Sequence, residues 1–113
     1  MHARLSSACL ALALSLPAGA VLAGEATVIW ASDRCEIVLV EKPGPEYGTV
    51  LRLGEGKIEI GDKFEGDFDS IDQIRKMKNL TSGEEIMMRG VRYSSKRSYV
   101  LQVMPKWCKA PKE

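Results

Sequence analysis

Hydrophobic and polar positions alternate along much of the chain after residue 24, and a period of two residues is typical of β-strands. The alternating segments are short, rich in β-branched residues and separated by turn-forming residues; they are 26–32, 35–42, 49–53, 57–64, 84–93 and 98–104. The first two form either two short strands or one long bent strand. The next two predict a hairpin in which Ile58 and Ile60 point inward, and the last two predict a second hairpin.

One segment changes from the strand period to the helical period. Ser70 and Gln73 form the capping-box pattern of a helix start, and apolar residues then recur at helical spacing as far as Leu80. Acidic residues lie before this start and basic residues lie after it, an arrangement that is favourable against the helix dipole. We therefore predict a helix over residues 70–80.

With the first two segments counted as one bent strand, the resulting order is three strands, one helix and two strands, which we assign to a single domain over residues 24–113. This order resembles that of an OB-like fold, a small five-stranded barrel with its helix between the third and fourth strands. The resemblance is one of element order, without an accompanying sequence motif. The prediction is thus a mainly β protein with one helix, and the alternative is an SH3-like barrel or an α+β sheet with one helix.

Residues 1–23 have the pattern of a bacterial signal peptide. An apolar run from Leu10 ends in Val21-Leu22-Ala23, with small residues at the two positions that a signal peptidase reads. We expect cleavage after Ala23 and a mature chain that is periplasmic or secreted. The run is short for a membrane span, and an uncleaved membrane anchor is the alternative.

Export determines how the cysteines are interpreted. Cys9 leaves with the signal peptide, so the mature chain contains Cys35 and Cys108. In an oxidising compartment two cysteines usually form one disulfide, and such a bridge would join an early strand to the C-terminus. Trp107 is expected to pack near this bridge.

The chain lacks most catalytic chemistry. Its one histidine is His2, so the mature protein has no imidazole for base catalysis or metal binding, and bridged cysteines leave no thiolate. We therefore predict that the protein is not an enzyme and uses no cofactor and no metal. The alternative is a hydrolase that uses two carboxylates from the set Glu59, Asp62, Glu65, Asp67 and Asp69.

Two patterns resemble metal ligands but have simpler explanations. Asp67, Asp69 and Asp72 are spaced like the start of an acidic cation loop, yet the glycine and glutamate that complete such a loop are missing. Helix capping explains the same residues. Met87 and Met88 offer thioethers for copper, but neighbouring strand residues point to opposite faces.

Charge is balanced overall but not locally. The whole chain has 16 Lys and Arg against 15 Asp and Glu, and loss of Arg4 with the signal peptide makes these numbers equal. Acids are concentrated between residues 55 and 72, whereas no acid occurs between Arg89 and Lys112. The C-terminal part of the chain is therefore suited to an anionic partner.

A candidate site follows from the barrel prediction. The ligand face of an OB-like barrel follows its second and third strands and two flanking loops, which correspond here to 42–48 and 93–98. Basic and aromatic side chains are interleaved around these loops, and the candidate binding residues are Tyr47, Arg89, Arg92, Tyr93, Lys96 and Arg97. They converge only if the strand is bulged at Gly90. A solvated edge hairpin without a ligand is the alternative.

Small size and missing catalytic groups favour a small exported, non-catalytic binding module. Its expected partner is a protein in the cell envelope, with a role of the inhibitor, immunity or accessory type. The alternative is a module that binds an anionic polymer or a glycan through the basic hairpin, either as a monomer or as an oligomer.

Overall fold

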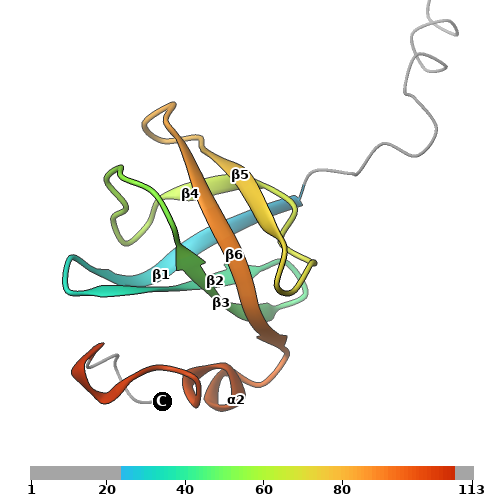
Figure 1. Cartoon of the computed structure of the whole chain (residues 1–113). Coiled ribbons are helices and arrows are strands. Elements are labelled where there is room, and N and C mark those ends of the chain that lie inside the picture. Colours follow the sequence, from blue (N-terminus) through green and yellow to red (C-terminus); the bar gives the residue numbers. More distant parts are fainter. Residues whose placement is uncertain (1–23, 109–113) are drawn as a thin grey trace, which may run out of the picture.

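The computed structural model describes residues 24–108, which form a small β-barrel with the C-terminal segment, residues 95–108, outside it (Figure 1). Six antiparallel strands close the barrel in the order β1-β2-β3-β6-β5-β4. The strands are β1 (Gly24–Ser32), β2 (Cys35–Lys42), β3 (Glu46–Arg52), β4 (Lys63–Gly66), β5 (Ile74–Asn79) and β6 (Glu85–Ser94). They are followed by the helix α2 (Arg97–Leu101) and the 3-10 turn η1 (Lys106–Cys108). The prediction of a small, mainly β barrel with one helix is confirmed.

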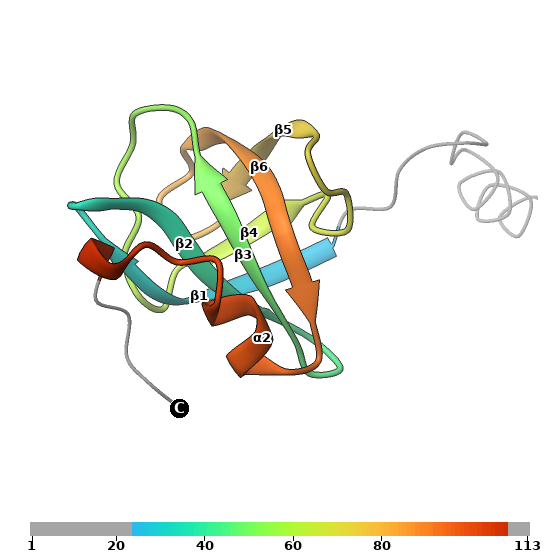
Figure 2. The same ribbon diagram turned by 60° about the horizontal axis from the view of Figure 1, so that its bottom comes forward.

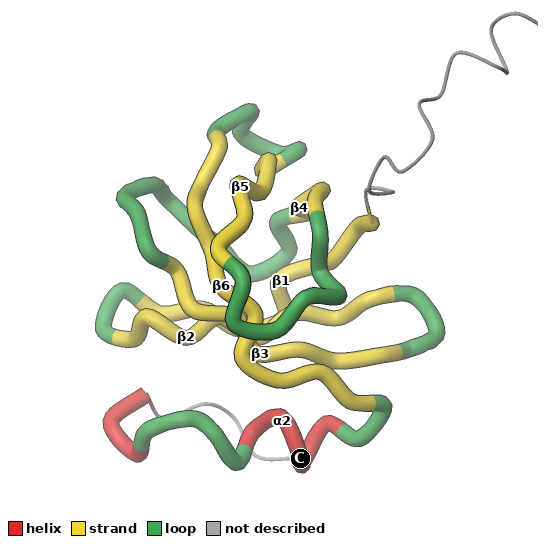
Figure 3. Tube along the Cα trace, turned by 45° about the vertical axis from the view of Figure 1, so that its right-hand side comes forward, coloured by secondary structure: helices red, strands yellow, loops and turns green. Residues whose placement is uncertain are grey.

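The barrel differs in detail from the predicted order. It has six strands rather than five, and its helix follows the last strand instead of lying between the third and fourth (Figure 3). Residues 26–42 form two strands joined by a tight turn, which resolves the two alternatives in favour of separate strands. The proposed signal peptide lies outside the described residues.

The predicted strand 57–64 is mostly a loop. Ile58 is buried as expected, but Ile60 is 63% exposed, and the strand β4 begins only at Lys63. The loop turns at Gly61, whose φ of +97° favours glycine, and the buried carboxylate of Asp62 accepts a hydrogen bond from the Glu59 amide at 2.9 Å. Local polar contacts thus replace the expected strand pairing.

The predicted helix over residues 70–80 is wrong, because this segment contains the strand β5. Its alternation places Met77 and Asn79 inside the barrel and leaves Lys76 and Lys78 exposed. The other apolar residues of the expected helical stripe are exposed, namely Ile71, Ile74 and Leu80. A helix would therefore have had no buried partner for its apolar face.

Local geometry also disfavours a helix start at Ser70. The carboxylate of Asp67 accepts hydrogen bonds from the backbone amides of Asp69 and Ser70 and from the Ser70 hydroxyl. Asp72 adopts φ of +63°, which interrupts right-handed helical geometry. The capping-box pattern is thus part of a loop that leads into β5.

The second predicted hairpin is wrong in its last strand. Residues 85–94 form β6, but β6 pairs with β3 and β5, so neither side of it is free for a following strand. Because the barrel is closed, the chain after β6 has no strand edge to join. It forms α2 instead, with Val100 buried against the barrel.

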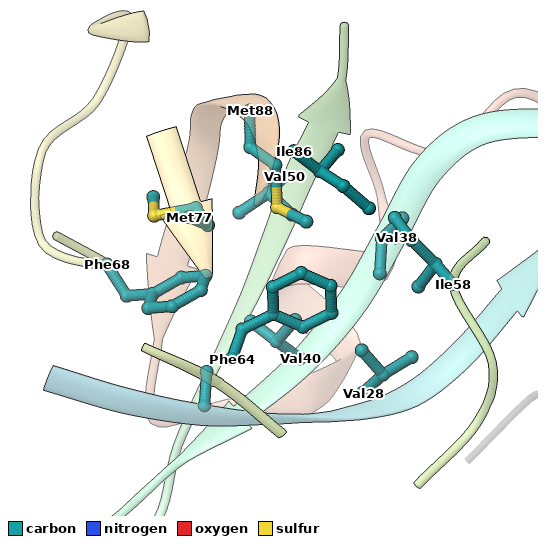
Figure 4. Packing of buried hydrophobic residues seen from close by; sticks show 11 residues of the cluster. Val28, Val38, Val40, Val50, Ile58, Phe64, Phe68, Met77, Ile86 and Met88 are labelled. Carbon is teal, nitrogen blue, oxygen red and sulfur yellow. The ribbon is translucent and has the colours of Figure 1, made fainter. Parts of the chain in front are cut away.

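The barrel interior is the main hydrophobic core (Figure 4). Phe64 lies near its centre, and Val40, Val50 and Met88 surround it. The other buried members are Ala26, Val28, Val38, Ile58, Phe68, Met77 and Ile86. This core comes from all six strands and from the loops on either side of β4.

A second cluster lies on the outside of the barrel, and we call it the outer cluster. It consists of Cys35, Ile37 and Cys108, packed against Trp30, Leu51, Val91 and Met104. Figure 2 shows how it arises, since the C-terminal segment runs from the end of β6 across the outside of β3 and β2. Its end is fixed by the predicted disulfide between Cys35 and Cys108, which is confirmed, with a Cα–Cα distance of 5.2 Å.

Candidate functional site

The outer face of the barrel carries side chains in regular cross-strand rows. One row, here called the outer row, runs from β2 through β3 and β6 to β5 and consists of Ile37, Leu51, Arg89 and Ile74. At one side of this row the outer face is covered by α2, whose Val100 is fully buried. At the other side, no helix of the described chain covers the face. The outer row therefore lies at the boundary between covered and open surface.

A groove separates the last part of the C-terminal segment from β2 and β3. It has a volume of about 290 Å³, and its apolar lining residues are Ile37, Leu51, Val103, Pro105 and Trp107. Both disulfide cysteines, Arg34 and Glu36 complete the lining. Trp107 is 71% exposed, the largest exposure among the large hydrophobic residues of the described chain. We call this site the apolar groove.

The disulfide and η1 hold Trp107 in place at this groove. Cys108 donates its backbone amide to the carbonyl of Pro105 at 3.0 Å, which closes the turn that contains Trp107. Both cysteines of the bridge are buried. The tryptophan is thus presented to solvent from a backbone that is tied covalently to β2, which lowers the entropy lost when a partner binds.

A second hollow adjoins the apolar groove and has a volume of about 550 Å³. The two share Arg34, Cys35 and Glu36. The remaining lining comes from the turn after β1, the end of β3 and the turn that follows it, and consists of Asp33, Arg52, Leu53, Gly54, Glu55 and Gly56. Charged groups of both signs therefore border the groove, together with one apolar side chain.

Two contacts fix the turn after β3 against the barrel. The guanidinium of Arg52 donates a hydrogen bond to the carbonyl of Gly56. The amide of Leu53 donates to the carbonyl of Met87 at 2.9 Å and so extends the contact between β3 and β6. The wall of this second hollow is therefore part of the folded barrel.

The structure brings most of the sequence-predicted binding residues to one end of the barrel. Tyr47 pairs with Ser94, and Gly48 pairs with Tyr93, so the start of β3 lies beside the end of β6. Lys96 and Arg97 follow directly at the start of α2. Arg89 is not part of this group, because it faces Leu51 and Ile74 in the outer row.

A bulge in β6 decides where these side chains point. Val50 pairs with Gly90 and Thr49 pairs with Arg92, so Val91 is the extra residue. The bulge predicted at Gly90 is therefore one residue further along. Val91 joins the outer cluster and Arg92 contacts α2, whereas Tyr93 packs against the barrel core.

Two basic residues at this end of the barrel, Arg92 and Lys42, already have internal partners, whereas Lys96 and Arg97 form no ion pair within residues 24–108. The guanidinium of Arg92 lies 4.2 Å from the centre of the Tyr99 ring and donates to the carbonyl of Tyr99 at 3.1 Å. Lys42 forms ion pairs with Glu46 at 2.8 Å and with Asp69 at 2.6 Å. These contacts leave less positive charge for a ligand than the sequence indicates.

Tyr93 is a structural residue in this arrangement. Its ring lies 4.7 Å from the ammonium of Lys42, and burial raises the pKa of its hydroxyl, with a further increase from nearby carboxylates such as Asp67. The pKa of Lys42 is also raised, because its hydrogen bonds to Asp69 and Glu46 outweigh the opposing effect of burial. Lys42 thereby ties the loop after β4 to the turn between β2 and β3.

Asp67 does not have the properties of a catalytic acid. Hydrogen bonds from the Ser70 hydroxyl and the Asp69 amide, together with Arg75, hold its pKa at about 2. A general acid requires a raised pKa. Asp62, another member of the predicted carboxylate set, is engaged by the Glu59 amide and by the side-chain amide of Asn79.

Two kinds of feature are missing from the described part of the chain. Within 24–108, no group of three or more His, Cys, Asp or Glu side chains is arranged to hold a metal ion. No helix in this part of the chain is long and apolar enough to cross a membrane.

The apolar groove was not among the sequence predictions. Its walls come from segments far apart in the chain, and α2 was expected to be a strand. The available signal was a tryptophan directly before the C-terminal cysteine, a position where a disulfide restricts how the side chain can pack.

Comparisons with protein-family models, with curated proteins and with solved structures found no match to this chain.

Proposed function

We propose that the protein is a small exported, non-catalytic module that binds a protein partner through the apolar groove, in a role of the inhibitor, immunity or accessory type. The observation that carries this proposal is the exposed Trp107 beside an apolar groove whose wall is fixed by a disulfide. Tryptophan in such a position is typical of the few residues that dominate the binding energy of protein interfaces.

The surroundings of the groove favour a protein over a polyanion. Arg34 and Arg52 lie near Asp33, Glu36 and Glu55, so the rim carries both signs of charge. A polyanion requires a surface of predominantly positive charge, whereas protein interfaces combine an apolar centre with a mixed polar rim. The aromatic and arginine side chains at this site are also types that are enriched in such interfaces.

Export to the periplasm or the cell exterior is part of the same proposal. The disulfide between Cys35 and Cys108 supports it, because such bridges persist mainly in oxidising compartments. The predicted signal peptide would direct this export.

The alternative proposal is binding of an anionic polymer or a glycan at the basic end of the barrel. Exposed Lys96 favours it, but the partners already made by Arg92 and Lys42 weigh against it. Binding of this kind would be lost steeply as salt is added, whereas binding in the apolar groove depends less on salt.

Replacement of Trp107 tests the proposed function. Trp107→Ala should change the free energy of unfolding by less than about 0.5 kcal/mol, because the side chain is mostly exposed. The same change should greatly reduce recovery of the partner when the oxidised protein is used to capture proteins from envelope extracts.

Leu80→Ala is the matched control, since Leu80 is also an exposed apolar residue. It follows β5 in the turn to β6, at the opposite end of the molecule from the C-terminal segment (Figure 1). Equal recovery by the parent and both variants would contradict binding through the groove.

A further inference from the structure

Arg89 is the one charged member of the otherwise apolar outer row. Its register partners are Leu51 on β3 and Ile74 on β5, and its strand neighbour Met88 points into the barrel. From this placement, we propose that the partner presents an acidic side chain flanked by apolar residues, and that its carboxylate binds Arg89. The inference rests on the proposed function and names the chemistry of the partner.

The guanidinium of Arg89 lacks the partners that Arg52, Arg75 and Arg92 have, and it shares this property with Arg97, whose Nε is also buried without a hydrogen-bond partner. The Arg89 Nε is buried without a hydrogen-bond partner, and within residues 24–108 the Arg89 side chain forms no ion pair. By contrast, Arg75 pairs with Asp67, Arg92 donates to Tyr99, and Arg52 donates to Gly56. A half-buried guanidinium without an ion-pair partner favours a carboxylate, which accepts two parallel hydrogen bonds from it.

Apolar side chains lie on both sides of Arg89. Ile74, its partner on β5, is 54% exposed although it is part of a strand. Met87 precedes Arg89 by two residues on the same face of β6, and Leu53 is held beside Met87 by a backbone hydrogen bond. These exposed side chains continue the apolar surface beyond Leu51, which lines the apolar groove.

The nearby charges also favour an acidic partner. Lys76 is the partner of Met87, and Lys78 lies two residues further along the outer face of β5. Two exposed acids are paired with them: Glu65 on β4 and Glu85 on β6 are both register partners of Lys78, and the Glu85 carboxylate lies 3.8 Å from the Lys76 ammonium. These two lysines and two acids balance in number, so the excess positive charge on this face is that of Arg89.

The closed barrel determines how a partner is recognised on this face. Both neighbours of β6 are present, as are both neighbours of β5, so a partner strand cannot add to either one. Recognition therefore depends on side chains. The partner's carboxylate would bind Arg89, and the apolar residues beside that carboxylate would contact Ile74, Met87 and the apolar groove.

Selection from a display library of random peptides of about twelve residues tests this inference. The oxidised protein should enrich peptides that contain Asp or Glu flanked by aliphatic or aromatic residues. Arg89→Gln should weaken their binding about tenfold or more, and exchange of the acid for its amide should weaken binding to the parent protein by a similar factor. Lys63→Gln, on the exposed face of β4, is the matched control and should leave binding unchanged.

The outcomes separate the inference from the proposed function. If the selected peptides contain no acid, and their binding is lost with Trp107→Ala but unchanged with Arg89→Gln, the inference is wrong and the proposed function stands. If peptide binding is unchanged by Trp107→Ala and by Arg89→Gln, the inference and the proposed function are both wrong. The amide exchange is made in the peptide, so this arm of the test does not depend on the folding of a variant.

Discussion

At the residue scale, single polar side chains determine the conformation of the loops. Asp67 is the clearest case, because its side chain is only 12% exposed and it receives hydrogen bonds from Asp69, Ser70 and Arg75. These contacts order the segment between β4 and β5, where the sequence pattern indicated a helix. The pH dependence of stability should reveal their contribution.

Asp67→Asn should lower the free energy of unfolding at pH 7 by about 2 kcal/mol. The pKa of Asp67 is lowered from 3.8 to about 2 in the folded protein, so the ionised group stabilises the fold above about pH 4. This stabilisation should be lost as the pH falls from about 4 to about 2. Urea denaturation of both proteins across this range measures the effect.

The control for this series is Asp33→Asn, because Asp33 is exposed in the turn between β1 and β2. Its stability should follow that of the parent at every pH. A stability difference between Asp67→Asn and the parent that stays constant down to pH 2 would show that the ionised carboxylate is not the stabilising group.

At the element scale, the C-terminal segment is held to the barrel by one covalent bond and the outer cluster. The bridge connects residues separated by 73 positions, and Met104 from the same segment packs in the outer cluster. The segment carries α2, η1 and the wall of the apolar groove, so the bridge stabilises the fold and also shapes the proposed site.

Replacement of both cysteines tests this dependence. Cys35→Ser with Cys108→Ser should lower the free energy of unfolding by about 4 kcal/mol, because a loop of this length is no longer constrained in the unfolded chain. Thermal or urea denaturation measures the loss, with the reduced parent protein as the control. Stability within about 0.5 kcal/mol of the oxidised parent would show that the bridge has no such role.

The strands also show where the alternation of apolar and polar residues was sufficient to predict the secondary structure. Residues 35–42 and 49–53 alternate with strongly apolar inward positions; 35–42 form β2 as predicted, and 49–52 lie in β3. In 74–79 a single apolar residue, Met77, points inward, so the period of two was hidden by Ile71 and Leu80. Residues 98–104 alternate like a strand, but no strand edge was left for them to join.

At the scale of the whole molecule, the barrel and its bridge could be predicted, whereas the groove could not. The disulfide followed from composition and the expected compartment, and the mainly β class followed from the alternation. The groove depends on how residues 103–108 lie against β2 and β3, which is a long-range contact with no local signal. The same applies to Arg89, since its isolation becomes visible only through its register partners on two other strands.

In the folded molecule, the residues of the predicted basic site lie on two different surfaces. The predicted basic site divides into an end of the barrel, where Arg92 is already engaged, and an open face, where Arg89 is not. The partner is therefore expected to bind on the open face and in the apolar groove.

Site-specific photo-crosslinking in the cells that make the protein tests this placement most directly. A photoreactive amino acid at position 107, in the apolar groove, should form an adduct with one protein, and Arg89→Glu should reduce its yield. The same probe at position 80, in the turn between β5 and β6, should form no such adduct. An adduct from position 80, with none from position 107, would contradict binding through the groove.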